Sequence, residues 1–224
     1  MAGGRLARVE IPLFPLRTVL FPGMRLPLRV FEDRYLAMTR ELLETPGPFG
    51  VVLIRQGEET GRSVVPYAVG TTAMIEGVRE GQGGSLMVSA KGVQRFRLVR
   101  MLSPRPYPRG EVELIDDRDW VPSVTLTRAL ESVRATFPVY FRLALAMTDQ
   151  WARGLSLPRE PHGLVDFVAQ WLQVDEEAKQ RLIEGEASDR VGHLAELLDD
   201  LLTRTRDEVV EYQRGKFRAL GSAN

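Results

Sequence analysis

The chain has 224 residues, of which 44% are hydrophobic and 27% charged, and its 30 basic and 30 acidic residues give a formal net charge of +0. This is the composition of a globular protein long enough to bury a core without cross-links, so it excludes a disordered or fibrous protein. The sequence contains no cysteine, which excludes disulfides, thiolate nucleophiles and cysteine-bound zinc within these residues.

The net charge of zero is the sum of two unequal halves. Residues 1–115 contain sixteen basic and eleven acidic side chains, a formal charge of +5, whereas residues 116–224 contain fourteen and nineteen, a charge of −5. A change of sign along the chain indicates two units with different surfaces.

The first half is predicted to be rich in β-structure, because short apolar or alternating runs flanked by glycine and proline are typical of strands. These runs cover residues 8–16, 26–30, 49–54, 69–78, 86–101 and 111–114. The glycine-rich segment 81–84 predicts a hairpin connection. One helix is expected over residues 32–44, where Tyr35, Met38 and Leu42 recur at helical spacing.

Three prolines, Pro12, Pro15 and Pro22, lie in the opening segment of the chain. Proline has no N–H to donate to a neighbouring strand, so this segment is expected to run along a sheet edge or through a bulge.

The second half is predicted to be helical. Helices are expected from Ser123 or Thr125 to about residue 147 with a kink or break near Pro138, over residues 162–172, from Asp175 to Gly185, and from a cap at Ser188 onward. Strands followed by helices predict an α+β fold, with a β-rich subdomain over residues 1–118 and an α-helical bundle over residues 119–224.

No arrangement of side chains in the sequence predicts catalysis or metal binding. The two histidines, His162 and His193, do not have the spacing of a metal-binding motif, so neither a metal nor a cofactor is expected. Ser89 and Lys91 are two residues apart on one strand and share a face, which makes a serine–lysine hydrolase a conceivable alternative. A solvated strand face is the favoured interpretation, and no enzymatic activity is expected.

A second alternative is an RNA-binding protein. Arg95, Arg97 and Arg100 lie close to Phe96, as in a basic surface with a stacking platform. Strand alternation, however, places Phe96 on the face opposite Arg95 and Arg97, and a charge of +5 is a modest footprint for nucleic acid. RNA binding is therefore the less favoured function, and DNA binding is not expected.

The tryptophans Trp120, Trp151 and Trp171 all lie in the second half. A ligand-stacking cage is conceivable, but packing in a core or between subdomains is the expected role, because two of them lie within helical apolar patterns.

The opening segment is the most specific feature of the sequence. Residues 11–24, IPLFPLRTVLFPGM, and residues 27–32, PLRVFE, resemble the beginning of the Lon protease N-terminal domain, in particular the stand-alone bacterial proteins made of that domain. The resemblance continues in residues 49–54, 69–71, 92–96 and 175–198.

The resemblance implies an N-terminal β-rich pseudo-barrel of the PUA-like type with one helix, followed by a C-terminal helical bundle. It also implies a role in recognising substrate proteins. Because these residues contain no Walker motif and no serine–lysine protease module, ATP use and proteolysis are not expected.

The predicted function is therefore a non-enzymatic protein- or peptide-binding module. Extended chains can add to an exposed sheet edge beside apolar pockets, so the predicted binding residues come from the opening motif and its neighbours: Phe14, Leu16, Phe21, Met24 and Arg29. For most of the aromatic and proline residues of this motif, locking the β-structure closed is the favoured alternative role.

The expected partners are unfolded or extended polypeptide segments, with a separate protease or chaperone as a further candidate. The sequence has no apolar run of membrane-spanning length and no secretory signal, so a cytoplasmic protein without membrane contact is expected. A monomer or weak homodimer is expected.

Overall fold

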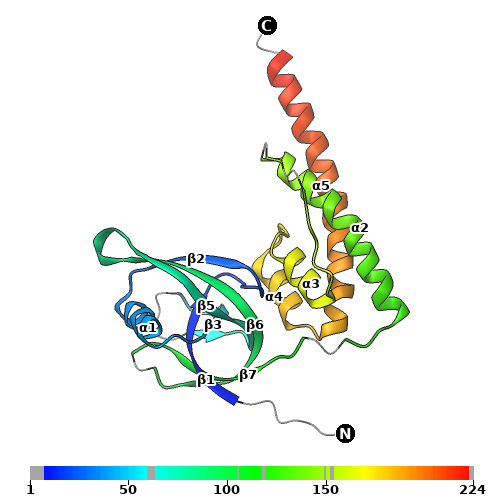
Figure 1. Cartoon of the computed structure of the whole chain (residues 1–224). Coiled ribbons are helices and arrows are strands. Elements are labelled where there is room, and N and C mark those ends of the chain that lie inside the picture. The colour runs from blue at the N-terminus through cyan, green and yellow to red at the C-terminus, as the bar shows by residue number, and fades with distance from the viewer. Residues whose placement is uncertain are drawn as a thin grey trace. The chain divides into compact units, whose positions relative to one another are not determined.

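The computed structural model describes residues 8–59, 64–104, 106–117, 120–148, 150–151 and 154–221, with side chains as far as residue 212. The chain forms two compact units, residues 1–119 with 173–185 and residues 120–172 with 186–224. Strands make up most of the first unit and helices make up the second (Figure 1). The predicted α+β fold, with one helix among the strands of the N-terminal half, is confirmed.

The strands of the first unit form one closed ring with two additions. Each of the strands β1, β7, β6, β5 and β3 pairs with the next, and β3 returns to β1 through a parallel pairing, while β2 pairs with β6 and β4 with β3. The strands are β1 (Arg8–Leu16), β2 (Arg25–Val30), β3 (Phe49–Gln56), β4 (Val65–Pro66), β5 (Val69–Glu80), β6 (Leu86–Leu102) and β7 (Arg109–Leu114).

The prolines of β1 are accommodated because this strand changes partner at its middle. Residues 8–12 pair with β7 in the antiparallel direction, and residues 13–16 pair with β3 in the parallel direction. At the change, the N–H of Leu13 donates to the carbonyl of Pro108 at 2.8 Å. Each half of β1 therefore hydrogen-bonds to a neighbouring strand on one side only. The missing N–H groups of Pro12 and Pro15 can be accommodated because the other side of each half needs no donor.

β5 and β6 continue beyond the ring as a long hairpin (Figure 1). The turn contains Gly83 and Gly84 at φ 66° and 75°, a conformation that favours glycine. Residues 74–80 and 86–91 of the hairpin, together with β2, form a three-stranded sheet that we call the arm.

Helix α1 (Asp33–Glu44) packs with the inner face of the arm, and its residues share one core with those of the strands. The core residues on α1 and the arm are Tyr35, Leu36, Met38, Leu42, Leu26, Val30, Val88 and Ala90. Two contacts of α1 fix its position. The ring of Tyr35 stacks on Phe14 at 4.1 Å between centroids, and the hydroxyl of Tyr107 donates to Glu41 Oε2 at 2.6 Å.

The two tyrosines are sensitive to alkaline pH. Burial, followed by the hydrogen bond to Glu41, raises the pKa of Tyr107 from its usual 10 to about 12, and burial raises the pKa of Tyr35 to about 12. The free energy of unfolding should therefore fall as the pH rises from about 10 to about 12, because the unfolded chain releases these protons first. Urea unfolding at several alkaline pH values measures this slope, and Tyr107→Phe should reduce it. An equal slope in that variant would contradict the assignment.

Helix α4 (Glu176–Glu184) belongs to the first unit although it lies far along the chain. The predicted bounds are confirmed, since Asp175 caps the helix by accepting from the N–H of Ala178 at 2.6 Å and Gly185 follows its last turn. The subdomain boundary at residue 118 stays a prediction, and the packing of α4 adds residues 173–185 to the strands of the first unit.

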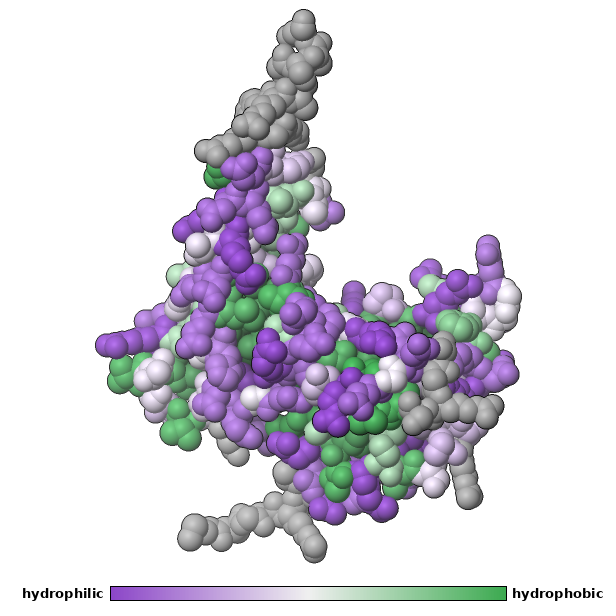
Figure 2. Space-filling model, turned by 180° about the vertical axis from the view of Figure 1, so that it is seen from behind, coloured by the Kyte–Doolittle hydropathy of each residue, from purple (hydrophilic) through white to green (hydrophobic). Residues whose placement is uncertain are grey.

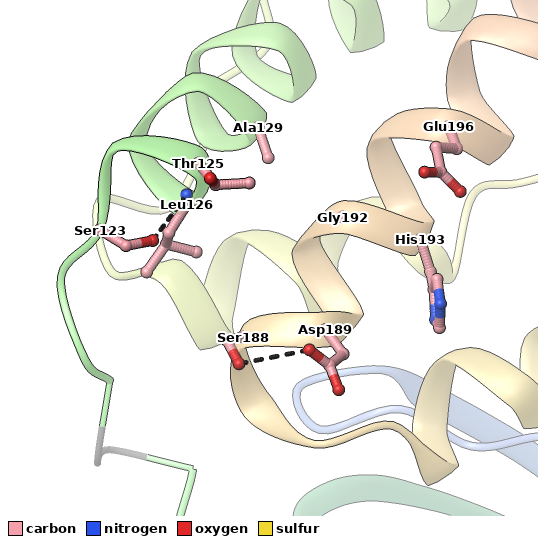
Figure 3. A pocket seen from close by; sticks show the side chains of 9 residues that line it. All are labelled: Ser123, Thr125, Leu126, Ala129, Ser188, Asp189, Gly192, His193 and Glu196. Carbon is pink, nitrogen blue, oxygen red and sulfur yellow. Dashed lines mark hydrogen bonds between the residues drawn. The ribbon is translucent and has the colours of Figure 1, made fainter.

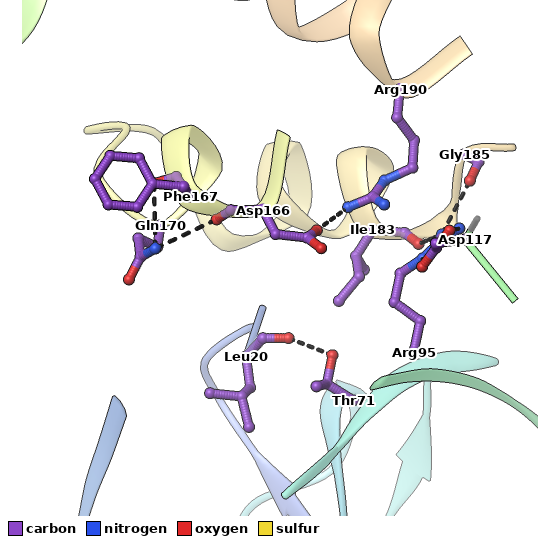
Figure 4. Close-up of polar contacts among 10 residues, drawn as sticks. All are labelled: Leu20, Thr71, Arg95, Asp117, Asp166, Phe167, Gln170, Ile183, Gly185 and Arg190. Carbon is purple, nitrogen blue, oxygen red and sulfur yellow. Dashed lines mark hydrogen bonds and ion pairs between the residues drawn. The ribbon is translucent and has the colours of Figure 1, made fainter. Parts of the chain in front are cut away.

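Polar contacts hold α4 along its whole length. At its start, Glu176 Oε2 accepts from the backbone N–H of Val19 at 2.6 Å. In its middle, Gln180 Nε2 donates to the carbonyl of Val69 at 3.0 Å. At its end, the guanidinium of Arg95 on β6 donates to the carbonyls of Ile183 and Gly185 (Figure 4).

Arg95 is the central residue of this connection, with only 2% of its surface exposed. Besides the two carbonyls, its guanidinium donates through two nitrogens to the carboxylate of Asp117, directly after β7. A guanidinium offers five donors in one plane, so one side chain joins β6, the segment after β7 and the end of α4.

We expect Arg95→Met to lower the free energy of unfolding by about 3–5 kcal/mol, because it leaves the Asp117 carboxylate without its buried partner. Adding Asp117→Asn should restore part of the loss, since the remaining side chain is neutral. Urea unfolding and amide hydrogen exchange in α4 measure both effects. Arg40→Met, at an exposed position of α1, is the control and should change stability by less than about 0.5 kcal/mol; a similar small change at Arg95 would show that the connection contributes little.

The second unit consists of α2 (Val124–Ala146), α3 (Pro161–Ala169) and α5 (Ala187–Gly221). Ser123 caps α2 by accepting from the N–H of Leu126 at 3.0 Å, and α2 continues through Pro138. α5 begins before Ser188, the expected cap, because the carbonyl of Glu186 already accepts from the N–H of Arg190. The buried guanidinium of Arg190 bonds the carboxylate of Asp166 on α3 (Figure 4).

Candidate polypeptide-binding surface

The five sequence-predicted binding residues divide into a buried and an accessible group. Phe14 and Leu16 on β1 are each 8% exposed, and Phe21 in the following loop is 0% exposed. Met24 is partly buried against the same core, and Arg29 on β2 is exposed. Binding through this motif stays a prediction, and Met24 and Arg29 are the two members whose side chains a partner can reach in this conformation.

The residues that carry the family resemblance have clear packing roles. A Cβ atom on Gly70 would lie 2.3 Å from the carbonyl oxygen of Val51, and one on Gly92 would lie 2.3 Å from that of Phe21. The hydroxyl of Thr71 donates to the carbonyl of Leu20 at 2.6 Å (Figure 4). These residues hold the opening loop against the strands. The motif can therefore be characteristic of the family because it packs the fold, and contact with a ligand is not needed to explain it.

Arg29 lies on the outer face of the arm. Burial alternates along β2, with residues 26 and 30 buried and residues 25, 27 and 29 exposed. The strand register then sets three outward rows across the arm. We call these nine residues the arm face: Arg25–Lys91–Met74, Pro27–Ser89–Gly77 and Arg29–Met87–Arg79.

The arm face is cationic and partly apolar. Four of its nine residues are arginine or lysine, and the side chains of Met74 and Met87 are 37% and 41% exposed. The arm contains two carboxylates: Glu76, in the bulge between Ile75 and Gly77, contacts Arg25 at 3.3 Å, and Glu80 follows Arg79 at the end of β5. The side chains of the central row are short, and a Cβ atom on Gly77 would meet no atom within 4 Å.

The outer face of β1, β7 and β6 is different, because its charges pair with one another. Arg8 contacts Glu113 at 2.8 Å and Glu111 at 3.4 Å, and Arg100 contacts Glu111 at 2.6 Å. The hydrogen bond from Arg100 lowers the pKa of Glu111, and the hydrogen bond to Glu113 raises the pKa of Arg8. Positive charge in excess of its partners therefore lies on the arm, and the ring carries a balanced network.

The cluster that suggested RNA binding does not form one basic surface. Arg95 is buried and its guanidinium is occupied by Asp117 and the end of α4. Arg100 belongs to the balanced network of the ring. The sequence gives no local signal for this buried connection, because Arg95 lies between Gln94 and Phe96 beside another arginine, and its partner Asp117 comes twenty-two positions later.

Packing in a core, one of the two expected roles of the tryptophans, is wrong for two of them. Trp151 is 71% exposed, and Trp171 is 47% exposed with one edge-to-face contact to Phe141 at 5.3 Å. Other exposed hydrophobic residues are scattered as well, and Figure 2 shows them as separate patches among hydrophilic residues. Scattered single residues of this kind are ordinary on protein surfaces.

A pocket of about 390 Å³ in the second unit contains hydroxyl, carboxylate and imidazole groups. It is lined by Ser123, Thr125, Leu126, Ala129, Ser188, Asp189, Gly192, His193 and Glu196. Ser123 caps α2 and Ser188 donates to Asp189, while the imidazole of His193 does not point toward either serine (Figure 3). This geometry lacks the nucleophile–base contact that a serine hydrolase requires.

Within the described ranges, no three histidine or acidic side chains are placed to hold a metal ion. A search of the same ranges for a helix both long and apolar enough to cross a membrane finds none.

Comparison with known proteins identifies the family of this fold. Residues 10–200 match the model of the ATP-dependent protease La (LON) substrate-binding domain. The chain belongs to this family. The match includes the opening motif, the arm, α4 and the first part of α5.

Solved structures support the same assignment. A Lon N-terminal domain protein from Xanthomonas campestris is 28% identical with a TM-score of 0.62, and the alignment covers 83% of this chain and 96% of that protein. The N-terminal domain of Lon protease from the Mycobacterium avium complex has the same fold, with a TM-score of 0.59 at 17% identity over 86% of this chain and 99% of that one.

Full-length Lon proteases are also similar to this chain. The Lon protease of Koribacter versatilis is 29% identical over 78% of the chain, and that of Porphyromonas gingivalis is 27% identical over 93%. The chain spans only 22% and 26% of the lengths of these two relatives. The shared part is thus the Lon substrate-binding domain.

Proposed function

We propose that this chain is a non-enzymatic module that binds unfolded or extended segments of protein substrates in the cytoplasm. The observation that carries the proposal is the family match, which covers residues 10–200 and is described as a substrate-binding domain. The absence of a nucleophile–base pair from the described pocket supports a binding role. A separate protease or chaperone is the expected recipient of the bound substrate, and the module is expected to act as a monomer or weak homodimer.

The arm face supports this proposal physically. Exposed methionines are flexible and polarisable, so they accommodate apolar side chains of different shapes. Met24 and Arg29, the accessible members of the predicted site, lie at the two sides of this region: Arg29 is in an outer row, and the carbonyl of Met24 accepts from the N–H of Gly92 at 2.9 Å beside Lys91.

The test is binding to one small protein in two states, the folded wild type and a permanently unfolded variant of the same composition. The module should bind the unfolded form at least about tenfold more tightly, because only that form exposes extended apolar segments. Isothermal titration calorimetry measures both affinities. Equal affinity for the two states, or no binding to either, would contradict the proposed function.

A further inference from the structure

We propose that the arm face selects acidic extended segments of polypeptide, which lie across the three strands of the arm along the central row of short side chains. This inference rests on the proposed function and names the chemistry of the segment that is bound. It follows from the dimensions, the charges and the apolar side chains of the arm face.

The rows of the arm face form a surface that matches an extended chain. The two outer rows are separated by four residues along β2, which is a distance of about 13 Å. In the direction across the strands, the three strands of the arm span about 10 Å. The central row, Pro27–Ser89–Gly77, leaves open space above Gly77. Three or four residues of an extended chain, at about 3.3 Å each, cross this row from one strand to the third.

Cationic side chains lie on both sides of the central row. Arg25 and Lys91 lie in one outer row, and Arg29 and Arg79 lie in the other. A chain on the central row directs successive side chains to opposite sides, so its carboxylates reach a guanidinium or ammonium group in either direction. Arginine binds a carboxylate through two parallel hydrogen bonds, which favours aspartate and glutamate over neutral polar residues.

Each outer row also contains one exposed methionine, Met74 beside Lys91 and Met87 between Arg29 and Arg79. The matching segment therefore combines acidic residues with apolar ones. Because methionine adapts its shape, the arm face distinguishes the charge of a segment more strongly than its exact sequence.

A polypeptide fits the arm face better than a nucleic acid. None of the nine residues of the arm face is aromatic, whereas proteins that bind single-stranded nucleic acids stack the bases on aromatic side chains. The exposed methionines would instead lie against the phosphate backbone, where they make no favourable contact.

The experiment compares three synthetic peptides of equal length with the same leucine and methionine positions and with glutamate, glutamine or lysine at all other positions. The glutamate peptide should bind the full chain at least about tenfold more tightly than the lysine peptide, with the glutamine peptide between them. Fluorescence anisotropy with an uncharged dye measures the affinities, and the preference should decrease as salt rises from about 50 to 300 mM.

Two variants test whether the arm face carries the preference. Arg29→Glu with Arg79→Glu replaces both cations of one outer row and should abolish or reverse the preference. The matched control, Arg40→Glu with Arg55→Glu, makes the same charge change at exposed positions of α1 and β3 and should keep it. Circular dichroism and thermal unfolding establish that both variants are folded. Equal loss of preference in the two pairs would overturn the proposal.

A third variant tests the path of the chain. Gly77→Phe fills the open space of the central row without changing charge, and it should weaken binding of the glutamate peptide at least about fivefold. Gly154→Phe, at an exposed position with no atom within 4 Å of the added Cβ, is its control. Unchanged binding by Gly77→Phe would overturn the proposed path and favour pairing of the peptide with the edge of β5.

The remaining outcomes separate this inference from the proposed function. If the wild type binds the unfolded protein but all three peptides equally, the acidic preference is wrong and the binding function stands. If it binds neither the unfolded protein nor the peptides, both are wrong. If a single-stranded oligonucleotide of the same charge binds more tightly than the glutamate peptide, the arm face is a nucleic-acid surface and the inference is overturned.

Discussion

The buried guanidinium of Arg95 connects the strands of the first unit to α4, which follows them after a long stretch of chain. It bonds Asp117 at the end of the strand series and the carbonyls of Ile183 and Gly185 at the end of α4. A buried charge is costly unless all its hydrogen-bonding groups find partners. The position of α4 thus depends on the closed ring, because β6 must present Arg95 at the place where the last turn of the helix exposes its unbonded carbonyls.

One sheet carries two kinds of charged surface. On the ring, arginine and glutamate face each other across β1, β7 and β6 and neutralise one another. On the arm, most cations have no carboxylate in the neighbouring strand, and Glu76 occupies a bulge. Four cations and two carboxylates on β2 and the hairpin thus supply a net charge of +2 out of the +5 of residues 1–115, and these strands share a core with α1.

The sequence predicts most elements of this fold because their signals are local. Apolar alternation identifies the strands, and Asp175 and Gly185 mark the ends of α4. The docking of α4 has no such signal, since Glu176 and Gln180 bond backbone groups of Val19 and Val69, which any residue could supply.

The site was less predictable for two physical reasons. The aromatic residues of the opening motif are apolar, so their pattern does not tell a binding surface from a core. The arm face depends on register, and bulges near Ala73 and Glu76 shift which residues point outward.

Helix α4 belongs to the first unit but follows α2 and α3 of the second unit in the chain. During synthesis, the ring can form early, but its contacts with α4 must wait until residue 185 has left the ribosome. The first unit is therefore completed only after α2 and α3 of the second unit have been made.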